Sequence, residues 1–445
     1  MQPMNSKMKT LVAQTPLLST KPVLNARLAE ARGVIVRVVG ASLRVGEMVR
    51  LIRPDTQEVQ IGEVVGFGQD GALVVPFDGL MGLSNITQVE GCGLNWRGFD
   101  ASSLLGRVVD GLGRPLDGGT APTTATARQQ TSMLPLVNPL DRPVISTPFA
   151  TGVRAIDGLL SCGVGQRVGI FAPAGGGKST LIGMIANGAV VDAIVIALIG
   201  ERGREVAEFI HDHLGPRRAS SIVITSTAER PAAERIKAAE LACSVASELR
   251  AEGKQVLLLF DSLTRYARAL REVGLAVGEP PVRRGYPPRV FAELPRLTES
   301  AGLTRQGSVT AFFTVLAEDE EMTDPIAEEA RSLLDGHIQL SGRLGAAGHY
   351  PAIDVLKSKS RVMTRVTSQK HRDDANRVRG WMSRYQEVEL LLQIGEYRRG
   401  NDSESDLAID RHKLIERFLR QPQDQCGDWG STISSLHALC RGADK

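Results

Sequence analysis

The sequence predicts an α/β protein built around a parallel sheet, with a small β-barrel before the sheet and a helical domain after it. Between residues 149 and 368, short and almost wholly apolar runs alternate with helical patterns, as in a parallel sheet covered on both faces. Between residues 23 and 97, short β-type runs are separated by glycine-containing turns, a spacing typical of a small barrel. From 369 to 445 the chain is charged and carries apolar residues at helical spacing.

The elements can be placed in order along the chain. Residues 1–22 are polar and irregular, and we expect a mobile N-terminal segment. Residues 98–148, rich in Gly, Pro, Thr and Ala, predict a linker that wraps or docks against the next domain. The predicted barrel strands lie near residues 34–39, 48–52, 63–67 and 72–77. The predicted sheet strands are 167–171, 193–199, 221–225, 256–260 and 310–316.

The composition is that of an ordinary soluble globular protein, with 42% hydrophobic and 23% charged residues in 445. A net charge of +3 and an aromatic content of 4% argue against a nucleic-acid-binding protein. No apolar stretch is long enough to span a bilayer, and no signal peptide is visible. The five cysteines are widely spaced without a CxxC pair, which favours reduced, structural cysteines in a cytosolic protein over a metal site.

A glycine-rich segment between an apolar run and a helical pattern predicts a phosphate-binding loop. The segment reads Ala174-Gly175-Gly176-Gly177-Lys178-Ser179-Thr180. Its glycines allow backbone N–H groups to point at phosphate oxygens, and the following helix adds its positive end. Lys178 is expected to reach the β- and γ-phosphates, and the Ser179 hydroxyl to ligate Mg²⁺. The first glycine usual in such loops is replaced by Ala172.

Two acidic residues at strand ends are the candidates for the rest of the site. Asp261 ends an apolar run and is expected on the Mg²⁺ side, opposite Ser179; the alternative is a helix N-cap. Glu201 follows another buried run and is the candidate to orient or deprotonate the attacking water. The alternative for Glu201 is a solvated turn with internal salt bridges. Arg202 would contact phosphate or steady Glu201, whereas Glu205 is expected to pair with a neighbouring arginine.

Two residues further along the chain each have alternative roles. Tyr350 would stack on an adenine ring, or else pack in the core before Pro351. Arg361 would neutralise transition-state charge in its own site or in a neighbour's, or else form a surface ion pair.

In this order the motifs resemble the hexameric ATPase family that includes the α and β subunits of rotary ATP synthases. Within that family the resemblance is greatest to the type III secretion ATPases and their flagellar-export relatives. It covers residues 25–420 and implies an N-terminal β-barrel, a RecA-like P-loop domain with a parallel sheet, and a C-terminal helical domain. The segments that carry it are 104–117, 152–158, 261–268, 278–288 and 332–338.

The resemblance also implies a set of site roles with ATP and Mg²⁺ as ligands. The matching residues are Lys178 and Ser179 for phosphate and Mg²⁺, Glu201 and Arg202 for catalysis, Asp261 for the Mg²⁺ side, Tyr350 for stacking on adenine, and Arg361 as an arginine finger for the adjacent subunit.

The activity that the resemblance implies is Mg²⁺-dependent ATP hydrolysis by a homohexameric ring. Such a ring would power type III protein secretion, releasing chaperones from export substrates and unfolding those substrates. The implied partners are a central stalk, peripheral stator proteins and chaperone–substrate complexes, with residues 370–445 as a contact surface. The implied location is cytoplasmic, peripheral at the inner face of the bacterial inner membrane. The loop 274–286 would line the ring's pore and touch the stalk or a threaded chain, or else be an ordinary connector.

Four alternatives remain open at this point. The first is a flagellar export ATPase, which the sequence separates only weakly from the secretion branch. Segment 387–397 and the short tail favour the secretion branch. A β-type ATP synthase subunit, or a nucleotide-binding subunit without catalysis, is disfavoured because Glu201 and Arg361 occur in one chain. An RNA translocase is disfavoured by the few aromatic residues and the near-neutral charge.

Overall fold

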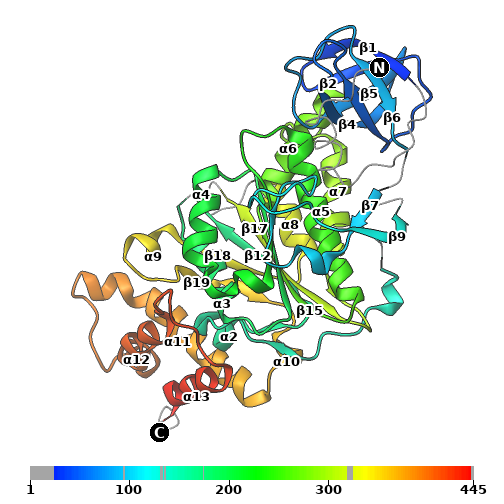
Figure 1. The fold of residues 1–445 in the computed structure, drawn as a ribbon. Helices are drawn as coiled ribbons and strands as arrows, with labels where there is room; N and C mark the ends of the chain where they lie inside the picture. Colours follow the sequence, from blue (N-terminus) through cyan, green and yellow to red (C-terminus); the bar gives the residue numbers. More distant parts are fainter. Residues whose placement is uncertain are drawn as a thin grey trace.

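The computed structural model describes residues 25–93, 96–130, 134, 137–173, 175–317 and 324–441. The barrel lies at one end of the molecule, the sheet domain in the middle and the C-terminal helices at the other end (Figure 1). The expected mobile segment 1–22 and Ala174 of the glycine-rich loop lie outside the described residues. Among the helices in these ranges, none combines the length and the apolar character needed to cross a membrane.

The N-terminal barrel is closed, with antiparallel strands in the order β1-β2-β5-β4-β3-β6. Alternating residues such as Val36 and Val38 point inward and are buried, because side chains on a strand alternate between its two faces. The predicted barrel is therefore confirmed. Its strands are β1 (Asn25–Arg32), β2 (Ile35–Val39), β3 (Met48–Ile52), β4 (Val59–Gly68), β5 (Gly71–Pro76) and β6 (Gln88–Gly91).

The main sheet has the order β19-β18-β12-β17-β15-β13-β14-β8 and is parallel except for β19, which pairs antiparallel with β18; β16 adds antiparallel to β17. The predicted parallel sheet is confirmed. β8 comes from the segment expected as a linker, so this segment docks by adding an edge strand. The strands are β8 (Val108–Val109), β12 (Arg167–Ala172), β13 (Ala193–Ile199), β14 (Ser221–Ser226), β15 (Gln255–Asp261), β16 (Gly302–Leu303), β17 (Ser308–Leu316), β18 (Gly336–Leu340) and β19 (Ile353–Ser360).

Helices cover both faces of the sheet. Their bounds in the sheet domain are α2 (Arg154–Leu159), α3 (Lys178–Gly188), α4 (Gly203–Glu208), α5 (Ala232–Ala251), α6 (Leu263–Ala276), α7 (Pro288–Glu299), α8 (Pro325–Leu333), α9 (Gly342–Ala346) and α10 (Met363–Val366). Short elements are η1 (Ala101–Leu104), η2 (Pro139–Asp141), η3 (Phe209–His213), η4 (Gly215–Ser220) and the two-stranded pairs β7 (Trp96–Phe99) with β9 (Thr124–Gln130) and β10 (Pro148–Phe149) with β11 (Cys162–Gly163).

Strand β13 shows why its sequence is apolar without interruption. Val195 and Ala197 belong to the core beneath α5 and α6, whereas Ile194 and Ile196 belong to the core that includes α2 and α3. Because both faces are buried, the run has no polar alternation. The uninterrupted apolar strands that predicted the sheet thus follow from its two helical layers.

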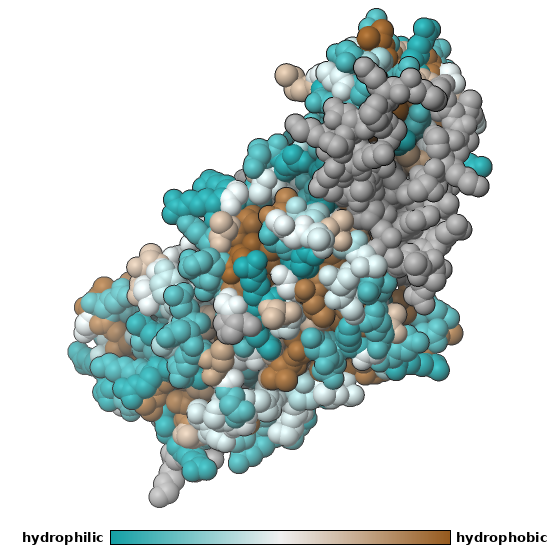
Figure 2. Space-filling model, viewed as in Figure 1, coloured by the Kyte–Doolittle hydropathy of each residue, from teal (hydrophilic) through white to brown (hydrophobic). Residues whose placement is uncertain are grey.

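The C-terminal domain consists of α11 (Gln369–Gln393), α12 (Ser403–Leu419) and α13 (Trp429–Cys440). Trp381 and Val388 of α11 are buried, as helical spacing predicts. Near the end of the same helix Leu390 is 64% exposed and Ile394 is 58% exposed, so the apolar stripe does not pack throughout. Figure 2 shows hydrophobic residues interspersed with hydrophilic ones over this domain, at the lower left.

Candidate active site

The glycine-rich loop joins the carboxyl end of β12 to the first turn of α3. Gly177 has φ +81°, a left-handed conformation that glycine adopts without strain, and it caps α3 with no side-chain hydrogen bond. The N-terminal N–H groups of α3 therefore have no side-chain cap, and they can bind phosphate oxygens. The Ser179 side chain belongs to an exposed residue on this turn.

Lys178 lies between two carboxylates. Its Nζ is 2.6 Å from Asp261 Oδ1 and 3.1 Å from Glu201 Oε1, and both acidic residues are buried. β12, β13 and β15 run in the same direction, so the residues that follow their carboxyl ends meet at one edge of the sheet. The three side chains that the sequence singled out are brought together at that edge.

Asp261 is held by groups from strand β17 and from the first turn of helix α3. Thr314 Oγ1 donates to Asp261 Oδ1 at 2.7 Å, beside the ammonium of Lys178. Burial raises the pKa of Asp261, and the nearby Lys178 charge opposes that shift. The alternative assignment of Asp261 as a helix N-cap is wrong, because Ser262 caps α6 and accepts from the N–H of Arg265. The carboxylate of Asp261 thus faces the loop.

The charge of Lys178 is maintained by its surroundings. Burial acts to lower its pKa, but the charges of Asp261 and Glu201 outweigh burial, and the pKa of Lys178 is raised. The ammonium is therefore protonated near neutral pH and can exchange these carboxylates for phosphate oxygens.

Sequence reasoning missed one residue at this cluster. Arg265 Nε lies 3.4 Å from Glu201 Oε1, so Glu201 has two cationic neighbours. The sequence contained a signal for this contact. Arg265 follows Asp261 by four residues and so lies in the first turn of α6, at the same sheet edge. Gly200 has φ +70°, and a Cβ there would lie 2.9 Å from Arg265 Cδ. A glycine at position 200 lets Arg265 lie close to the backbone beside Glu201.

Arg202 is not brought into the cluster. Its side chain is 80% exposed, and Nη1 lies 3.6 Å from Glu205 Oε1, so the predicted pairing of Glu205 with an arginine is seen. The expectation that Arg202 steadies Glu201 is wrong for the single chain, because Arg265 occupies that place. The alternative of a solvated turn holds for Arg202 and Glu205, whereas Glu201 is buried.

Tyr350 and Arg361 both lie at the surface. Tyr350 is 49% exposed, so the core-packing alternative is wrong, and its ring lies close to the loop: a Cβ on Gly177 would be 3.7 Å from Cε1. Arg361 is exposed and donates from Nη2 to the carbonyl of Arg331 at 3.1 Å. Within the described part of the chain Arg361 makes no ion pair, which leaves its charge available to another group.

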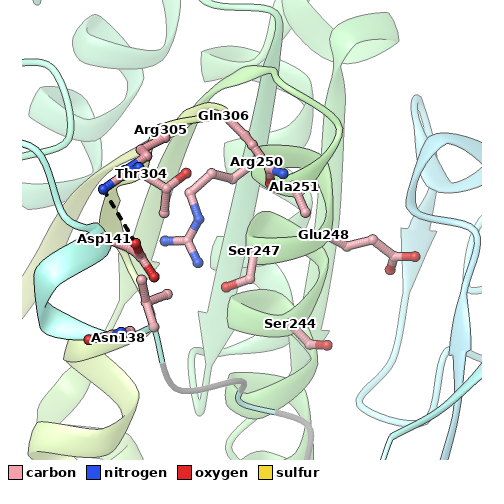
Figure 3. A pocket seen from close by; sticks show the side chains of 11 residues that line it. Asn138, Asp141, Ser244, Ser247, Glu248, Arg250, Ala251, Thr304, Arg305 and Gln306 are labelled. Atoms are coloured by element: carbon pink, nitrogen blue, oxygen red, sulfur yellow. Dashed lines mark ion pairs between the residues drawn. The ribbon is translucent and has the colours of Figure 1, made fainter.

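A cavity of about 430 Å³ lies elsewhere, near the amino end of β17. The Arg250 side chain points into it, and a dashed line joins Arg305 to Asp141 across it (Figure 3). Arg250 Nη1 donates to the carbonyls of Ser300 and Gly302, and Arg142 donates to those of Glu299 and Ala301. These two guanidinium groups thus cap the carboxyl end of α7, which is a structural use of their charge.

The oxygen groups beside the loop fit a magnesium ion. Mg²⁺ usually takes one or two protein oxygens and completes its shell with phosphates and water. The Ser179 hydroxyl, next to Lys178 in the chain, and the Asp261 carboxylate, 2.6 Å from Lys178 Nζ, are two such oxygen groups. No group of three or more His, Cys, Asp or Glu side chains suited to a metal occurs among the described residues.

Two family models match the chain over its two larger domains. Residues 152–360 match the nucleotide-binding domain of the ATP synthase alpha/beta family, and residues 367–438 match the T3SS EscN ATPase C-terminal domain.

Full-length relatives agree with these matches. The chain is 49% identical over 440 residues to a type 3 secretion system ATPase of Xanthomonas euvesicatoria, covering 96% of this chain and 99% of that protein. It is 43% identical to a flagellum-specific ATP synthase of Pseudomonas aeruginosa, and the match covers 96% of this chain and 95% of that protein. The structure of the assembled ATPase EscN from the enteropathogenic E. coli type III secretion system is similar with a TM-score of 0.87 and 44% identity, covering 93% of this chain and 99% of that one.

Proposed function

Because the chain belongs to the type 3 secretion system ATPase family, we propose that it hydrolyses ATP at the cluster of Lys178, Glu201 and Asp261. The observation that carries this proposal is the position of one buried ammonium between two buried carboxylates, at the start of α3. When ATP binds, Lys178 moves its contacts to the β- and γ-phosphates, and the N–H groups of the loop bind phosphate oxygens.

The move of Lys178 from the carboxylates to phosphate also prepares Glu201 to activate the attacking water. Once Lys178 contacts phosphate, the Glu201 carboxylate keeps Arg265 as its cationic neighbour and is free to accept a proton from the attacking water. Burial of Glu201 excludes bulk solvent from that water. A magnesium ion held through Ser179 and Asp261 would neutralise phosphate charge at this edge of the sheet.

Adenine recognition and completion of the site involve the two surface residues. Tyr350 offers an exposed ring beside the loop, on which the base would stack. Arg361 has an exposed guanidinium that pairs with no acidic side chain among the described residues, and it would act on the site of an adjacent copy. The proposed assembly is therefore a homohexameric ring in which each site needs a neighbour.

The proposed biological role is to drive type III protein secretion. A relative of this chain has been solved in complex with its central stalk EscO, which supports a stalk partner for this chain as well. Chaperone–substrate complexes and peripheral stator proteins are the other proposed partners, at a cytoplasmic position peripheral to the inner membrane. The flagellar alternative remains the second candidate, since flagellum-specific relatives reach 43% identity against 49% for the secretion relatives.

Replacing Glu201 by Gln tests the catalytic assignment. The variant keeps the side-chain volume but cannot accept a proton, so steady-state ATP hydrolysis should fall by about 10²-fold or more while binding of a fluorescent ATP analogue is retained. Lys178→Ala is the matched control, and it should lose nucleotide binding as well. Hydrolysis by Glu201→Gln at the original rate would contradict the assignment.

A further inference from the structure

We propose that Glu234, with Arg230 and the barrel residue Asp78, positions Glu201 for hydrolysis, and that this network connects the N-terminal barrel to the active site. The inference rests on the proposed role of Glu201. Its first observation is how the main chain beside Glu201 is held. Gly200 N donates to Ser226 O at 2.6 Å, and Ala228 N donates to Glu201 O at 3.0 Å. The N–H of the preceding residue and the carbonyl of Glu201 itself are thus hydrogen-bonded to Ser226 and Ala228.

Ser226, at the end of β14, is in turn held by Glu234. This residue lies in the first turn of α5 and is 1% exposed. Its Oε1 accepts from Ser226 Oγ at 3.2 Å, and its Oε2 accepts from Arg230 Nε at 2.6 Å. Burial raises the pKa of Glu234, and the charge of Arg230 opposes that shift. The carboxylate therefore holds both the end of β14 and the turn that follows it.

The network continues into the barrel through Asp78, which follows β5. Asp78 Oδ1 lies 3.1 Å from Arg230 Nη2 and 3.3 Å from Arg114 Nη1. Arg114 also binds Asp110, through its Nε at 2.5 Å. Three separate segments therefore share the carboxylate of Asp78: the barrel, the segment after β8, and the turn before α5.

A second contact ties the same helix to the barrel. Lys237 Nζ lies 3.0 Å from Glu63 Oε1 of β4, and the lysine side chain is 6% exposed. Because α5 is fastened to the barrel at two places, a displacement of the barrel moves the first turn of α5. That movement reaches residues 226–228 and then Glu201. The barrel can thereby alter the rate of the chemical step without touching the nucleotide.

The test uses full-length chain carrying Asp78→Asn or Arg230→Gln. Asp78→Asn keeps the side-chain size and removes the charge, whereas Arg230→Gln shortens the side chain and removes the guanidinium; each change breaks the connection. We expect kcat for ATP to fall three- to tenfold, with KM and the affinity for a fluorescent ATP analogue changed less than twofold. Arg230→Lys keeps the positive charge and should recover part of kcat. The matched control is Glu58→Gln, which breaks an exposed barrel ion pair with Arg53 and should leave kcat unchanged.

A network that merely fastens the domains together would give a different result. Asp78→Asn and Arg230→Gln would then lower the thermal midpoint, while kcat, measured well below that midpoint and at saturating chain concentration, would stay within twofold of the original. That outcome overturns the inference. Failure of the proposed function is detected separately, because it would appear as retained hydrolysis in Glu201→Gln.

Discussion

At the scale of single residues, the site consists of one ammonium, Lys178, between two carboxylates that we propose it exchanges for phosphate oxygens. Lys178 pairs with both Asp261 and Glu201, so each of these buried carboxylates has a cationic partner. The arrangement is costly to alter on one side only, because removing the ammonium would leave two carboxylates facing each other in a buried space. Tyr350 and Arg361, which we propose bind the base and act on the neighbouring site, are instead exposed, and their replacement should affect function without unfolding the chain.

Tyr350 allows a clean test of base stacking. Tyr350→Ala should raise KM for ATP five- to tenfold with little change in kcat, because an aromatic contact is worth about 1 kcal/mol and acts equally on substrate and transition state. Tyr350→Phe keeps the ring and should behave as the original chain. Steady-state kinetics with ATP measures both variants, and equal KM values for Ala and Phe would exclude stacking.

At the scale of elements, an ion pair with two hydrogen bonds helps to hold the segment between barrel and sheet. Arg107 Nε and Nη2 lie 2.8 Å and 3.0 Å from the two oxygens of Asp117. Val108 N of β8 donates to the same carboxylate at 3.1 Å. Because β8 is only two residues long, this pair fixes its position at the edge of the sheet.

The pair gives a pH dependence with a defined sign. Hydrogen bonding from Arg107 lowers the pKa of Asp117, so its stabilisation is present above the unfolded pKa of about 4 and is lost as pH falls further. Asp117→Asn should cost about 2 kcal/mol at pH 7 and less at pH 3. Urea unfolding at both pH values measures the difference. A cost independent of pH would show that the charge is unimportant.

At the scale of the whole molecule, the C-terminal domain and the barrel both connect to the proposed nucleotide site. Gln421 of the C-terminal domain donates its N–H to the carbonyl of Tyr350 at 2.9 Å, and α5 connects the site to the barrel. The Arg361 guanidinium, by contrast, has no partner acid in the described part of its own chain. This asymmetry is what a site shared between copies requires.

The shared site predicts a dependence on concentration. ATP hydrolysis per chain should rise steeply as the chain concentration increases, and Arg361→Ala should lower it about 10³-fold or more while nucleotide binding is kept. ATPase assays over a dilution series, with sedimentation to report assembly, measure both effects. Activity that is flat with concentration and indifferent to Arg361 would mean that each chain works alone.

The expected loop 274–286 begins later in the structure, because residues 274–276 belong to α6; residues 277–286 offer a test of coupling in the assembled machine. Residues 280–285 are exposed, and Arg283 pairs with Glu328 while Arg284 holds a left-handed conformation with φ +45°. Replacing both arginines by Glu should reduce protein export in cells while ATP hydrolysis is retained. Glu328→Gln controls for loss of the ion pair alone. Unchanged export would identify the loop as an ordinary connector.

The sequence by itself determined the features that depend on local pattern. Uninterrupted apolar runs predicted β13 and β15, because strands buried on both faces need no polar alternation. Glycines before Lys178 predicted the loop, because its backbone conformation depends on residues adjacent in the chain. Parallel strands also predicted that Glu201 and Asp261 would lie at one edge of the sheet.

Only the tertiary structure decided what depends on contacts between distant segments. It placed Arg265 rather than Arg202 beside Glu201, because α6 starts at the sheet edge while Arg202 faces solvent. It turned part of the expected linker into β8, because an edge strand offers unpaired backbone groups to any segment that passes it. It also joined Glu234 to the barrel residue Asp78 through Arg230, a contact that spacing along the chain does not encode.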